Sequence, residues 1–72
     1  MHSLEYYIKE ECRCVDDVIE IGSIYRTIMS DPDKYTEEYK EKWTNSMKAA
    51  EIRLELARMG LKSYIEENIL NY

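Results

Sequence analysis

Two cysteines and one histidine in this sequence could form a Cys–His catalytic pair or contribute ligands to a zinc site. Cys12 and Cys14 are separated by one residue, and His2 lies at the second position. A Cys–His site needs a base within reach of the thiol, and a zinc site needs four suitably spaced ligands. Two helical residues so spaced point about 200° apart, too far for a disulfide. We therefore expect buried or half-buried thiols in a reducing compartment, no metal and no cofactor; a redox or metal role is the alternative.

The carboxylates occur mostly as sequence neighbours, which is a poor arrangement for acid–base catalysis. The adjacent pairs are Glu10-Glu11, Asp16-Asp17, Glu37-Glu38 and Glu66-Glu67. Neighbours on a helix point about 100° apart, so neither member of a pair faces the other. The only glycines, Gly22 and Gly60, are too far apart for a phosphate-binding loop. The sequence predicts that the protein is not an enzyme.

Charge bears on which partners the chain can bind. The formal net charge is −5, from ten basic and fifteen acidic residues. Binding to phosphate backbones depends on clustered positive charge, so we expect no direct contact with nucleic acid. Glu5, Asp16 and Glu20 follow one edge of the predicted first helix. A row of carboxylates can imitate a phosphate backbone, and an acidic mimic that blocks a DNA- or RNA-binding protein is therefore an alternative function.

These side chains must be positioned by two long helices on either side of one break. Pro32 cannot donate a backbone hydrogen bond and disfavours a helical Asp31, while Thr36 can cap a second helix. We predict a helix over about 4–29, a break over 30–35 and a helix over about 36–59. After Gly60 the second helix either continues to about residue 70 or bends into a short third helix. The expected fold is a single all-α domain over residues 1–72, a helical hairpin.

One apolar stripe on each predicted helix should form the core, because apolar residues at spacings of four and three share a helical face. The predicted core residues are Ile8, Val15, Ile19, Trp43, Met47, Leu54 and Leu61.

The second helix carries another apolar stripe, which needs a surface of its own to cover it. Its members are Ala49, Ile52, Leu56 and Met59. They are offset by two residues, or about 200°, from the core stripe. Three surfaces could cover the stripe: residues 61–72 folded back over it, a second copy of the chain, or a different protein. We expect this stripe to be an interface through which the hairpin dimerises into a helical bundle.

Membrane-spanning and secretory segments bear on where the protein acts. No apolar run approaches the ~20 residues that span a bilayer, and no basic region with an apolar run opens the chain. We expect a cytoplasmic protein that does not bind membranes. The resulting hypothesis is a small protein–protein interaction module, a regulator or inhibitor of a larger macromolecule, of a size and composition that suit a phage or mobile-element product. A structural assembly subunit is a further alternative.

Overall fold

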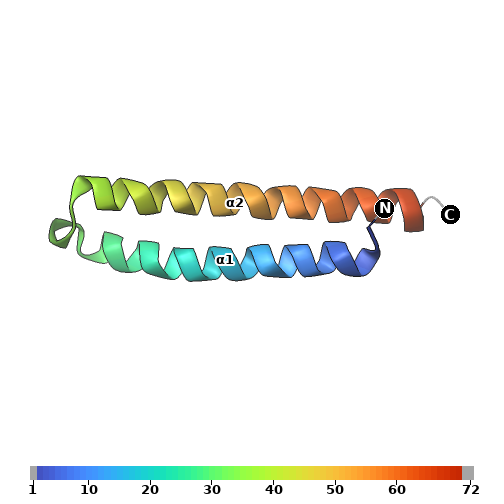
Figure 1. Cartoon of the computed structure of the whole chain (residues 1–72), viewed down its shortest axis with the longest axis horizontal. Coiled ribbons are helices and arrows are strands. Elements are labelled where there is room, and N and C mark those ends of the chain that lie inside the picture. Colours follow the sequence, from blue (N-terminus) through green and yellow to red (C-terminus); the bar gives the residue numbers. More distant parts are fainter. Residues whose placement is uncertain (1, 71–72) are drawn as a thin grey trace.

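A computed structural model describes residues 2–70 and shows two long antiparallel helices lying side by side (Figure 1). Helix α1 spans Leu4–Ser30, a short 3-10 turn η1 spans Pro32–Lys34, helix α2 spans Glu37–Ile65, and a π-helical turn η2 spans Glu66–Leu70. No strand occurs among the described residues. The prediction of an all-α helical hairpin is confirmed; residues 1, 71 and 72 of the predicted single domain lie outside the described residues.

The helix ends follow from local chemistry. Ser3 caps α1, where its Oγ accepts a hydrogen bond from the Tyr6 N–H at 3.3 Å. Thr36 caps α2 in the same way, with its Oγ1 3.2 Å from the Tyr39 nitrogen. Between them Pro32 opens η1, so the chain reverses direction inside the predicted break. The caps and Pro32 therefore mark where the helices begin and where the chain turns.

Helix α2 passes through Gly60 without a bend, which settles one alternative that the sequence left open. A Cβ atom added to Gly60 would lie 3.5 Å from Cε1 of Tyr7, an ordinary contact distance. The Tyr7 ring also lies 5.1 Å from the Tyr64 ring, centroid to centroid. Because α1 packs across this point, residues 61–70 extend along the same rod instead of folding back.

Gly60→Ala is expected to stabilise the hairpin by about 0.5–1 kcal/mol, because alanine favours the helix and its methyl group has room against Tyr7. The measurement is the thermal unfolding midpoint followed by far-ultraviolet circular dichroism. A lowered midpoint would contradict this expectation and show that Tyr7 cannot accept the methyl group.

The two helices meet along a seam with heptad spacing on each side. On α1 the seam residues are Leu4, Tyr7, Glu11, Cys14, Val18, Ile21, Tyr25 and Ile28, and on α2 they are Trp43, Met47, Ala50, Leu54, Ala57, Leu61 and Tyr64. All are buried or half-buried, but among residues 2–69 only three apolar side chains are buried, Cys14, Ile28 and Ala50. The core is thus a single thin layer.

Part of the predicted core is wrong. Ile8 and Ile19 are 46% and 60% exposed, whereas Val15 is half-buried, as are the predicted core residues of α2. The reason is a rotation of one residue, about 100° of helix: the seam on α1 runs through Tyr7, Cys14 and Val18 and their neighbours. On α2 the structure places Trp43, Met47, Leu54 and Leu61 in the seam, each half-buried.

Candidate interaction surface

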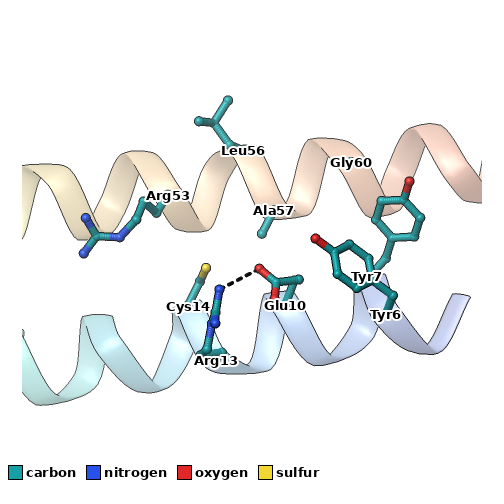
Figure 2. A pocket seen from close by; sticks show the side chains of 9 residues that line it. All are labelled: Tyr6, Tyr7, Glu10, Arg13, Cys14, Arg53, Leu56, Ala57 and Gly60. Carbon is teal, nitrogen blue, oxygen red and sulfur yellow. Dashed lines mark hydrogen bonds and ion pairs between the residues drawn. The ribbon is translucent and has the colours of Figure 1, made fainter. Parts of the chain in front are cut away.

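The side of α2 that faces away from α1 carries the apolar stripe Ala49, Ile52, Leu56 and Met59, called the outer stripe below. Its three large side chains are 59%, 60% and 57% exposed for Ile52, Leu56 and Met59 respectively, and Ala49 is half-buried. Figure 2 shows Leu56 pointing away from α1 while its neighbour Ala57 points toward α1. The helix therefore presents apolar side chains on two nearly opposite faces.

The outer stripe is continuous because nothing interrupts the helix beneath it. All four residues lie within the unbroken stretch Glu37–Ile65 and recur at spacings of three and four. The alternative in which residues 61–72 fold back over the stripe is wrong for residues 61–70, which continue α2. No segment among residues 2–69 covers Ile52, Leu56 or Met59, each of which is more than half exposed.

An exposed apolar surface of this kind has an energetic meaning. Fully burying a leucine, isoleucine or methionine side chain contributes about 1.5–3 kcal/mol. The outer stripe leaves more than half of that contribution unused at three positions. Contiguous apolar patches on small proteins typically mark interaction sites, whereas isolated exposed residues carry no such meaning.

A shallow groove of about 310 Å³ adjoins the outer stripe between the two helices (Figure 2). The residues that line it are Tyr6, Tyr7, Glu10, Arg13, Cys14, Arg53, Leu56, Ala57 and Gly60. The small residues Ala57 and Gly60 of α2 lie on one side of the groove, and the two tyrosines of α1 lie on the other. The Arg13 guanidinium donates to the Glu10 carboxylate at 2.9 Å, so these two charges are paired on its rim. This groove could not be predicted from the sequence, because its position depends on which small residues face which tyrosines across the seam.

The groups with potential chemistry are dispersed. Cys12 is exposed on α1 and Cys14 is buried in the seam, and both are free thiols, so the expectation of burial is wrong for Cys12. His2 stacks on the Tyr6 ring at 3.8 Å, centroid to centroid. Within the described residues, no group of three or more His, Cys, Asp and Glu side chains gathers as a metal site would require.

The acidic residues singled out from the sequence are exposed on α1 but do not form an uninterrupted row. Glu5 pairs with Lys9 at 3.0 Å, and Asp16 and Glu20 are exposed. Lys9 and Arg13, each in an ion pair, lie between Glu5 and Asp16 along the chain. Paired cations reduce the local negative potential, which weakens the resemblance to a phosphate backbone.

Comparisons with family models, with curated proteins and with solved structures find no match to the chain. In the part of the chain that the structure describes, neither helix combines the length and apolar character needed to cross a bilayer. The surface itself is therefore the basis for assigning a function.

Proposed function

We propose that this chain is a small protein–protein interaction module that acts as a dimer and regulates or inhibits a larger macromolecule in the cytoplasm. The observation that carries the proposal is the outer stripe, with three large apolar side chains more than half exposed on one straight helix. Association through this stripe would remove them from water, which is the main driving force for protein–protein contact.

The thin core supports dimerisation. A chain of this length rarely gains more than ~3–5 kcal/mol from its own core, and small domains often gain stability through oligomerisation. Among residues 2–69, only Ile28 of the large apolar side chains is buried to 2% exposure. A second copy would add a second buried layer without any additional chain length.

The regulatory part of the proposal is supported by a second exposed surface. Ile8, Cys12 and Ile19 are exposed along α1, whereas the outer stripe faces away from α1. Pairing through α2 would therefore leave this side of α1 accessible to a further protein.

Sedimentation equilibrium of the wild-type protein and of Leu56→Asp tests the proposal. We expect a wild-type dimer at tens of micromolar and a Leu56→Asp monomer, because each dimer would bury two carboxylates in an apolar contact. Ile19→Asp is a matched control: Ile19 is also 60% exposed, but it lies on the flank of α1. We expect this variant to remain dimeric. A wild-type monomer at tens of micromolar would refute the dimer.

Thermal stability should depend on protein concentration if folding and association are linked. For a dimer that unfolds to separate chains, each tenfold increase in concentration adds about 1.4 kcal/mol of stability. We expect the unfolding midpoint of the wild type to rise over a concentration series while that of Leu56→Asp stays constant. Equal behaviour of the two proteins would indicate that the outer stripe does not contribute to stability.

A further inference from the structure

Along the helix axis, the residue types of the outer stripe are arranged symmetrically about the level of Leu54, which itself lies in the seam on the opposite face. Ile52 and Leu56 lie two residues from Leu54, and Ala49 and Met59 lie five residues from it, on opposite sides. Continuing outward on the same face, Asn45 and Ser63 lie nine residues away, and Lys42 and Glu66 lie twelve residues away. Each apolar residue thus has an apolar counterpart at equal distance, and each polar residue has a polar one.

A face with this pattern is complementary to its own copy when the two helices run antiparallel. A two-fold axis at Leu54 would place Ile52 opposite the partner's Leu56 and the small Ala49 opposite the long Met59. A large side chain facing a small one is the arrangement in which two helices interdigitate. A slip of seven residues in either direction would instead set two of the four apolar residues against polar ones.

Charge distinguishes the antiparallel arrangement from a parallel one. In a parallel pairing, Lys42 would face Lys42 of the partner subunit, and Glu66 would likewise face its own copy. In the antiparallel pairing the exposed Lys42 lies near the partner's Glu66 at both ends of the contact, while Glu41 lies near the partner's Glu67. A parallel pairing would set each of these four residues against its own copy, so like charges would meet at all four positions. The two helix dipoles also oppose each other, which is the favourable orientation.

We infer, on the basis of the proposed function, that the partner of the outer stripe is a second copy of this chain, packed antiparallel on α2 with the two-fold axis at Leu54. Because the stripe faces away from α1, the four helices lie in the order α1, α2, partner α2, partner α1. The dimer is then a flat layer of helices and not the compact bundle expected from the sequence.

Chemical cross-linking between engineered cysteines tests this register. In a parent protein carrying Cys12→Ser, which removes the exposed thiol, Asn45→Cys and Ser63→Cys are introduced in separate chains. Positions 45 and 63 are about 27 Å apart along one helix, which is beyond the reach of a short bismaleimide. We expect a covalent dimer when the two variants are mixed and none when either variant is treated alone. The parent protein controls for reaction at the buried Cys14.

A second mixture controls for register. Glu38 lies on the same face as Asn45, one heptad earlier, so Glu38→Cys mixed with Ser63→Cys reports a slipped pairing. We expect no covalent dimer from this mixture.

The other outcomes separate the two proposals. Cross-linking of Asn45→Cys alone would show parallel helices and overturn the antiparallel inference while leaving self-association intact. Dimers by sedimentation that none of the mixtures cross-links would show that the second copy binds in another register or at another face, which also overturns it. Monomers by sedimentation would remove the dimer itself.

Discussion

Ile28→Ala is expected to lower the free energy of unfolding by about 2–5 kcal/mol, which is most of what a chain of this size possesses. Ile28 is 2% exposed and is the largest fully buried side chain among the described residues. Truncation removes buried methyl and methylene groups and leaves a cavity, and a seam only one layer thick has few neighbours that could fill it.

The measurement is urea denaturation followed by helical circular dichroism, at a fixed protein concentration so that association does not vary. Ile19→Ala makes the same chemical change on the same helix at a position that is 60% exposed. We expect this control to alter stability by no more than about 0.5 kcal/mol. Similar losses at both positions would mean that the seam through Ile28 is not the core of the folded protein.

The features of this fold that depend on a few neighbouring residues could be predicted from the sequence. Pro32 and the Thr36 cap define the break, and both lie within six residues of the helix ends they control. On α2 the apolar positions of the seam are surrounded by charged residues, so the stripe through Met47 and Leu54 stands out. Such local signals do not require any knowledge of the rest of the chain.

The features that depend on packing could not be predicted in the same way. On α1, the line through Ile8 and Ile19 and the line through Tyr7 and Val18 are both apolar, and only contact with α2 decides between them. At Gly60 the cost of continuing the helix is about 1 kcal/mol, which is small enough for packing against Tyr7 to decide the outcome.

Two adjacent alanines provide the most direct separation of folding from association. Ala50 is 0% exposed in the seam, whereas Ala49 belongs to the outer stripe. Ala50→Asp would place a carboxylate between the helices at a position that is shielded from water. Because an uncompensated buried charge costs about 3–5 kcal/mol, we expect this variant to be largely unfolded. Ala49→Asp should leave the helical signal intact.

The same pair of variants therefore gives opposite results in two measurements. By circular dichroism, Ala50→Asp loses its helical signal and Ala49→Asp retains it. By sedimentation, Ala49→Asp is a folded monomer, because its carboxylate would face the partner's Met59 in an apolar contact. A folded and dimeric Ala49→Asp protein would show that the outer stripe stays exposed in the functional state. A folded Ala50→Asp protein would show that the two helices do not pack along the seam. Both variants replace alanine with aspartate at neighbouring positions of one helix. A difference in helix propensity therefore cannot explain a difference between their helical signals.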